Sequence, residues 1–144
     1  MTTRNPRRHP STAASPRPLT TNRYLLWGPV VVYMAAIFYL SAQSSPPVPG
    51  AIPDYVLHAI EYCGLAIVVF RALAGGLPAA LDAKRVGLTL LITMAYAISD
   101  EVHQLFVPWR TADVIDLIAD AAGAVLGLMV YRAWLIIGSS RARI

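Results

Sequence analysis

Two histidines and seven carboxylic acids lie inside or beside apolar stretches of this sequence: Asp54, His58, Glu61, Asp100, Glu101, His103, Asp113, Asp116 and Asp120. Carboxylate and imidazole groups together can hold a divalent cation, transfer protons or hydrogen-bond neighbouring helices to one another. A charged side chain in hydrocarbon costs about 3 kcal/mol or more unless it finds a partner or a wet cavity. These ionisable residues are therefore candidate functional-site residues.

Their spacing predicts one polar stripe on each of three helices. Residues three, four or seven positions apart share a helix face. Three sets follow this spacing: Asp54, His58 and Glu61; Asp100, His103 and Gln104; and Asp113, Asp116 and Asp120. Glu101 alone lies about a quarter turn from its stripe. The last stripe continues through Gly123 and Gly127, and small residues four apart let helices approach closely in lipid. We expect the acidic face of that helix to be its packed face.

The surrounding sequence indicates that these helices cross a membrane. Of the 144 residues, 56% are hydrophobic and 14% are charged, which is too apolar for an ordinary soluble domain. Apolar windows cover residues 24–41, 54–74, 86–105 and 113–137, each near the ~20 residues that a spanning helix needs. We expect an all-α polytopic membrane protein, a bundle of four transmembrane helices over residues 24–137. Residues 1–23 are expected to form a flexible basic tail, and residues 138–144 a short basic tail.

The positions of the basic residues predict the orientation. Eleven of the twelve Lys and Arg residues precede the first window, join the second to the third, or follow the fourth. The positive-inside rule then places both termini in the cytoplasm and two short loops outside, in a multi-pass protein of the cytoplasmic membrane. The sequence pI near 9.6 reflects this topology and anionic lipid, not nucleic acid. The polar stripes then converge at the outer leaflet, where the proline-rich loop 43–53 can roof them.

Three segments resemble a known family. Residues 54–62 (DYVLHAIEY) place Asp, His and Tyr four residues apart at the entry to a helix. Residues 99–110 (SDEVHQLFVPWR) combine Asp-Glu-x-His-Gln with an arginine six positions beyond the glutamine. Residues 113–127 are similar to a closing Asp-x-x-Asn/Asp-x-x-Gly-x-x-x-Gly helix. Over residues 24–131 the chain thus resembles the VanZ-like membrane proteins, named for an accessory protein linked to teicoplanin resistance. The resemblance implies a four-helix membrane fold and a link to the bacterial cell envelope.

The chain departs from that family pattern at two positions. Tyr55 stands where the family usually has lysine, which removes a cation beside the acidic residues. Trp109 stands where the family usually has glycine, immediately before Arg110. Both departures fall next to the predicted polar cluster, so they bear on what the cluster binds.

A non-catalytic envelope role is the leading hypothesis. The outward rim would contribute to glycopeptide (teicoplanin) tolerance, with Gln104, Arg110 and Trp109 contacting a glycopeptide or a lipid-linked wall precursor. Arginine can bind phosphate or carboxylate bidentately, and tryptophan suits a sugar or acyl chain. His58, Glu61, Asp100 and His103 would form a hydrogen-bonded or cation-holding floor, to which Asp116 and Asp120 would anchor the fourth helix. Membrane lipid is the other expected partner. No catalytic residue or cofactor is assigned, although the floor is compatible with a divalent metal.

Two other hypotheses stay open. The same carboxylates and histidines could serve an intramembrane metal- or acid/base-dependent hydrolase acting on a lipid or peptide substrate. However, the sequence has no His-Glu-x-x-His motif and no serine in a nucleophile motif. A proton or small-cation path is a third hypothesis. The inner halves of the four windows carry few polar side chains, so such a path would have to use the gap beside Thr93 and Tyr96 or a pore built by oligomerisation. Alternatively, each polar residue could simply hydrogen-bond one helix to another.

Overall fold

The computed structural model describes residues 22–44 and 52–141, with side chains up to Gly138, as four α-helices and no strand within that part of the chain. The helices are α1 (Arg23–Ser41), α2 (Asp54–Ala74), α3 (Ala83–Gln104) and α4 (Val114–Arg141). The all-α prediction is confirmed. The predicted basic tail before residue 22 and most of the predicted proline-rich loop lie outside the described residues. Helix α4 continues beyond residue 137, where we expected a tail, and runs through Gly138 to Arg141.

Capping residues explain where the helices begin and end. Asn22 and Asp82 are the N-caps of α1 and α3, and their side chains accept hydrogen bonds from backbone N–H groups in the first turn. Asp113 does the same for α4, because its carboxylate accepts from the N–H of Ile115 at 2.8 Å. Such caps contribute about 1 kcal/mol each. Helix α2 ends at Gly75, whose φ of 76° is the left-handed conformation that glycine adopts without steric cost.

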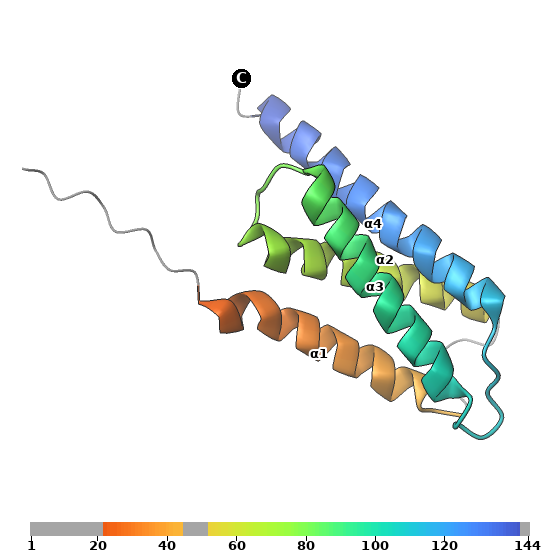
Figure 1. The fold of residues 1–144 in the computed structure, drawn as a ribbon. Coiled ribbons are helices and arrows are strands. Elements are labelled where there is room, and N and C mark those ends of the chain that lie inside the picture. Colours follow the sequence, from red (N-terminus) through yellow and green to blue (C-terminus); the bar gives the residue numbers. More distant parts are fainter. Residues whose placement is uncertain (1–21, 45–51, 142–144) are drawn as a thin grey trace, which may run out of the picture.

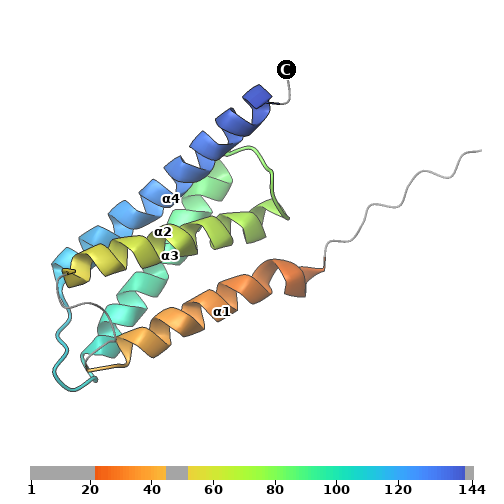
Figure 2. The same cartoon turned by 180° about the vertical axis from the view of Figure 1, so that it is seen from behind.

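The helices alternate in direction. Helices α1 and α3 run toward the end of the bundle at the lower right of Figure 1, and α2 and α4 run away from it. Helices α2 and α3 lie between α1 and α4 in both views (Figures 1 and 2). We call the end where α1 and α3 finish and α2 and α4 begin the acidic end, and the opposite end the basic end. Each of the four helices therefore has one terminus at the acidic end.

The outer surface of this bundle is more apolar than that of a soluble protein. Exposed positions along all four helices carry large apolar side chains, such as Val32, Leu91 and Ile118, each at least 64% exposed. Buried positions include many polar residues: Ser41, His58, Thr89, Thr93, Asp100, Glu101, Gln104, Asp116 and Asp120. Such an apolar outer surface is stable only when lipid covers it. The chain is therefore a membrane protein.

Three of the helices have both the length and the composition of membrane spans. Helices α1 and α2 and residues Val114–Gly138 of α4 are long and apolar enough to cross a membrane. Helix α3 has a comparable length of 22 residues but carries Lys84 and Arg85 in its first turn and Asp100 and Glu101 in its last turns, which lower its hydropathy. These charges lie toward its two ends, and the middle of α3 is apolar apart from threonines.

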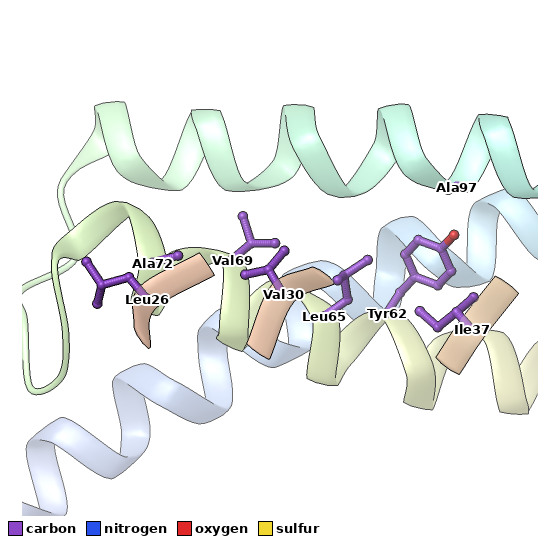
Figure 3. Close-up of a cluster of buried hydrophobic side chains, with 8 residues drawn as sticks. All are labelled: Leu26, Val30, Ile37, Tyr62, Leu65, Val69, Ala72 and Ala97. Carbon is purple, nitrogen blue, oxygen red and sulfur yellow. The ribbon is translucent and has the colours of Figure 1, made fainter. Parts of the chain in front are cut away.

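The apolar core lies between α1, α2 and α3. Figure 3 shows its buried side chains: Leu26, Val30, Ile37, Tyr62, Leu65, Val69, Ala72 and Ala97. Helices α2 and α4 meet through a second apolar cluster, of Phe70, Leu128 and Tyr131, and through glycine. A Cβ atom added at Gly123 or Gly127 would overlap the backbone carbonyl of Ala59 or Cys63, respectively. The prediction that these glycines lie on the packed face of α4 is confirmed, and the close contact holds the first half of α4 against α2.

Candidate functional site

A histidine of α2 faces two aspartates of α4 inside the acidic end. Nδ1 of His58 lies 3.1 Å from Oδ1 of Asp120, and its Nε2 lies 3.9 Å from Oδ2 of Asp116. All three residues are buried, with Asp120 fully so. Asp116 and Asp120 are four residues apart, so they stand one above the other on the face of α4 that turns toward His58. The imidazole ring of His58 therefore lies between two carboxylates.

Glu101 joins this group from α3. Its side chain is buried, and its Oε2 accepts a hydrogen bond of 2.7 Å from the backbone N–H of Asp113, just before α4. Its Oε1 has no hydrogen-bond partner among the described residues. One ligand atom each from His58, Glu101 and Asp120 lie within 4.8 Å of one another. Three helices therefore bring nitrogen and oxygen donors to one buried point.

Asp100 forms a second polar group with α1. Its Oδ1 accepts a 2.6 Å hydrogen bond from the hydroxyl of Ser41, and its Oδ2 accepts a 3.2 Å bond from the amide of Gln104. A cavity of about 30 Å³ lies beside this group, room for a water molecule or a bare cation. Its lining includes His58, Glu61, Asp100, Gln104 and Arg110. The cavity separates the Asp100 group from the rim above it.

The rim is built around Arg110. Its guanidinium donates to Oδ2 of Asp54, at the start of α2, and to the backbone carbonyl of Gln43, just past α1. An open pocket of about 270 Å³ lies beside it, lined by Asp54, Tyr55, Trp109, Arg110, Thr111, Asp113, Ile115 and Asp116. The two departures from the family pattern, Tyr55 and Trp109, both line this pocket.

Trp109 occupies a backbone conformation that disfavours it. Its φ of 69° lies in the left-handed region, where a residue with a Cβ atom costs about 1 kcal/mol or more. Its side chain is 93% exposed, so few contacts within the described part of the chain compensate. This is the position where a glycine would fit without strain.

One predicted floor residue, His103, lies apart from the histidine and aspartate group, whereas Glu61 shares the small cavity with His58 and Asp100. His103 is half-buried and stacks on Phe38 of α1, with ring centroids 4.2 Å apart. Glu61 is half-buried and lines the small cavity. Helix α3 packs against three neighbours, so residues on different sides of it face different helices: Glu101 faces α4, Asp100 faces α1 and the cavity, and His103 faces α1 alone.

Two contributors were not predicted as site residues, although Tyr62 belongs to the family-like segment 54–62. Ser41 was read only as the end of an apolar window, yet it makes the shortest hydrogen bond to Asp100. Tyr62 is fully buried, and its hydroxyl has no hydrogen-bond partner among the described residues. The positions of both residues in the sequence indicate that they could reach the site. Ser41 ends one helix at the acidic end, and Tyr62 follows His58 by one helical turn.

The donor atoms can hold a metal ion in two overlapping sets. Asp54, His58 and Asp116 form one set near the rim, and His58, Glu101 and Asp120 form the other, which is buried throughout. Two buried carboxylate oxygens, Oε1 of Glu101 and Oδ2 of Asp120, have no hydrogen-bond partner in the described part of the chain. Buried carboxylates without partners are costly, so this end of the bundle is suited to bind a cation or polar ligand.

Comparison with known proteins gives one match. The family model described as VanZ/LLP1 matches residues 26–137, which is most of the chain and includes every residue of the site. No curated protein and no solved structure matches this chain.

Proposed function

The chain belongs to the VanZ/LLP1 family, and we propose that it is a multi-pass accessory protein of the bacterial cytoplasmic membrane. We propose that it contributes to tolerance of glycopeptides such as teicoplanin. The observation that carries the proposal is the open pocket of about 270 Å³ at the acidic end, where Arg110 and Trp109 stand over a buried polar floor. A ligand with both an acidic group and an apolar or sugar part matches that lining.

All four helices cross the membrane in this proposal, with the basic end in the cytoplasm. A helix of 22 residues, as in α3, is about 33 Å long, enough for the hydrocarbon core. Arg23, Arg71, Lys84, Arg85 and Arg132 belong to the basic end, whereas Arg110 belongs to the acidic end. This asymmetry supports the orientation through the positive-inside rule. The pocket then faces outward, where glycopeptides and wall precursors are met.

Arg110 and Trp109 are the proposed ligand contacts. Arg110 is paired with Asp54, whose side chain is 43% exposed, so a phosphate or carboxylate of the ligand can compete with that aspartate from the pocket. Trp109 offers an exposed ring at the membrane surface. Gln104 is buried and lines only the small cavity below, so it would contact a water-sized ligand while Arg110 and Trp109 hold the larger one.

Growth inhibition tests the proposal. The full-length protein, its Arg110→Gln variant and its Arg85→Gln variant are expressed at matched membrane levels in a susceptible bacterium. We expect the wild type and Arg85→Gln to raise the inhibitory concentration of teicoplanin several-fold, and Arg110→Gln to lose most of this protection. Vancomycin is tested in parallel to define the ligand class. Absence of protection by the wild type at matched expression would contradict the proposal.

A membrane-embedded hydrolase is the second candidate. The observation that favours it is the buried group of His58, Glu101 and Asp120 next to a water-sized cavity. A metal held there would activate water for attack on an ester, amide or phosphoester bond. The two candidates differ in the Glu101→Gln variant. A hydrolase requires that this variant bind labelled teicoplanin or precursor as well as the wild type does and yet give no protection, whereas a binding protein requires protection to follow binding.

A further inference from the structure

We propose that His58, Glu101 and Asp120 bind one divalent transition-metal ion. This inference does not depend on glycopeptide tolerance. The ion would be the cofactor that the hydrolase candidate needs, or a structural cation in the binding candidate. It rests on the arrangement of donors from three different helices around one buried point.

The distances fit ligands of a shared ion. Two donors that each lie about 2.1 Å from a tetrahedral ion are about 3.4 Å apart. Nδ1 of His58 and Oδ1 of Asp120 are 3.1 Å apart, and the nearest donor atoms of the three residues all fall within 4.8 Å. Small side-chain rotations would therefore close the set around an ion. No change in the helix packing is required.

Unpartnered atoms give the second reason. Oε1 of Glu101 and Oδ2 of Asp120 belong to residues that are 4% and 0% exposed, and neither atom has a hydrogen-bond partner within the described residues. Oε2 of Glu101 is already used by the backbone of Asp113, which fixes the orientation of the side chain and leaves Oε1 for a ligand. The nearby hydroxyl of Tyr62 is also buried and unpartnered in this part of the structure.

A hydrogen bond to His58 does not neutralise all of the buried carboxylates. A protonated His58 could neutralise one carboxylate, but Glu101, Asp116 and Asp120 are all buried around it. Arg110 is paired with Asp54 at the rim. A divalent cation would compensate the remaining negative charge, and buried carboxylates otherwise need protons or partners.

The other nitrogen of His58 fits the surroundings of a metal ligand. A histidine that binds metal through one ring nitrogen usually donates the other N–H to a carboxylate, which fixes the ring. Nε2 of His58 lies 3.9 Å from Oδ2 of Asp116, about 1 Å longer than a hydrogen bond, so the ring would have to shift for this N–H to donate to Asp116. One imidazole with two carboxylates favours Zn²⁺ or Mn²⁺ over Mg²⁺ or Ca²⁺, which prefer oxygen ligands alone.

The experiment is metal analysis of the full-length protein purified in detergent without chelator. After stripping, the protein is titrated with Zn²⁺, Mn²⁺, Co²⁺ and Mg²⁺, while the melting temperature and the visible absorption of bound Co²⁺ are recorded. We expect about one equivalent of Zn²⁺ or Mn²⁺ and a rise of about 5 °C or more in melting temperature, with a Co²⁺ spectrum that includes nitrogen ligation. Magnesium should give no comparable rise.

Four variants locate the ligands. Glu101→Gln and Asp120→Asn should lose the metal and the rise in melting temperature, whereas Asp82→Asn, at the basic end, and Asp54→Asn, in the rim set, should keep both. Failure of the wild type to bind Zn²⁺, Mn²⁺ or Co²⁺ would overturn the proposal even if a variant does not fold. Loss in Asp54→Asn with retention in Glu101→Gln would overturn the assignment of ligands. Neither result affects the teicoplanin assay, so failure of the metal site and failure of glycopeptide tolerance are distinguishable.

Discussion

The two ends of the bundle are formed by the same four helices, but several charged side chains are buried at the acidic end, whereas those described at the basic end are at least partly exposed. At the acidic end, Asp116, Asp120 and Glu101 point inward and are buried. At the basic end, Arg85 pairs with Asp82 at 3.1 Å while both side chains stay about half exposed, and an apolar groove of about 630 Å³ opens between α3 and α4. Exposed ion pairs contribute little to stability, and buried charges cost much. This difference is expected if the proposed metal ion offsets the cost of burying the inward carboxylates.

The ends also differ in how tightly α4 is held. Near the acidic end, Gly123 brings α4 against the backbone of Ala59, and Asp120 adds its contact with His58. Near the basic end, α4 is tied by Tyr131, whose hydroxyl accepts from the N–H of Ala79 and donates to the carbonyl of the same residue. Substitutions at the acidic end can therefore be compared with matched substitutions at the basic end.

The largest effect is expected from Gly123→Leu. The added side chain would meet the backbone of Ala59, which cannot move away as a flexible side chain could, so α2 and α4 must separate. We expect a loss of about 4 kcal/mol or more, or no folded protein. Thermal unfolding and size-exclusion profiles in detergent measure it. Gly138→Leu is the control, because a Cβ atom at Gly138 meets nothing within 4 Å, and an equal loss in both variants would contradict the packing argument.

A smaller but clear effect is expected from His58→Ala. The substitution leaves Asp120 buried without its partner, which should cost about 3 kcal/mol. Adding Asp120→Asn removes the unpaired charge and should restore part of that loss, which a double-mutant cycle measures. Asp82→Asn breaks the exposed pair at the basic end and should change stability by about 0.5 kcal/mol or less. If the two single variants are equally mild, the contrast between the two ends is wrong.

The smallest effect concerns two turns with the same backbone conformation. Gly75 between α2 and α3 has φ 76°, and Trp109 between α3 and α4 has φ 69°. Trp109→Gly should therefore raise the free energy of unfolding by up to about 1 kcal/mol, whereas Gly75→Ala should lower it by about 1 kcal/mol. Chemical denaturation of both variants measures the two signs. If Trp109→Gly also weakens protection against teicoplanin, the tryptophan is retained for its ligand despite the strain.

Most of the fold could be predicted from the apolar windows and the residue spacing of the sequence. The four apolar windows fall on the four helices, and Gly123 and Gly127 identify the face on which α4 meets α2. Length and hydropathy are sufficient for this because lipid covers every outer surface and the backbone can pair only within helices. The end of α4 was less predictable, since Gly138 is typical of a helix end and yet the helix runs on to Arg141.

The details of the site were less predictable because periodicity gives a face but not the neighbour of that face. Asp100, His103 and Gln104 share one side of α3, yet His103 stacks on Phe38 while Gln104 bonds Asp100. Glu101, a quarter turn away, faces α4 and joins His58. These partners depend on how α3 is rotated between α1, α2 and α4. The sequence alone does not specify that rotation.

Arg110 has a practical consequence for engineering the protein. Its guanidinium contacts Gln43 and Asp54, which are the two ends of the connection between the first two helices. Because a residue from another part of the chain contacts both ends, lengthening the connection should not separate them, and each doubling of its length would cost only about 0.6 kcal/mol. A short epitope or fluorescent label inserted between Gln43 and Asp54 should therefore report on the protein in living membranes without displacing the helices.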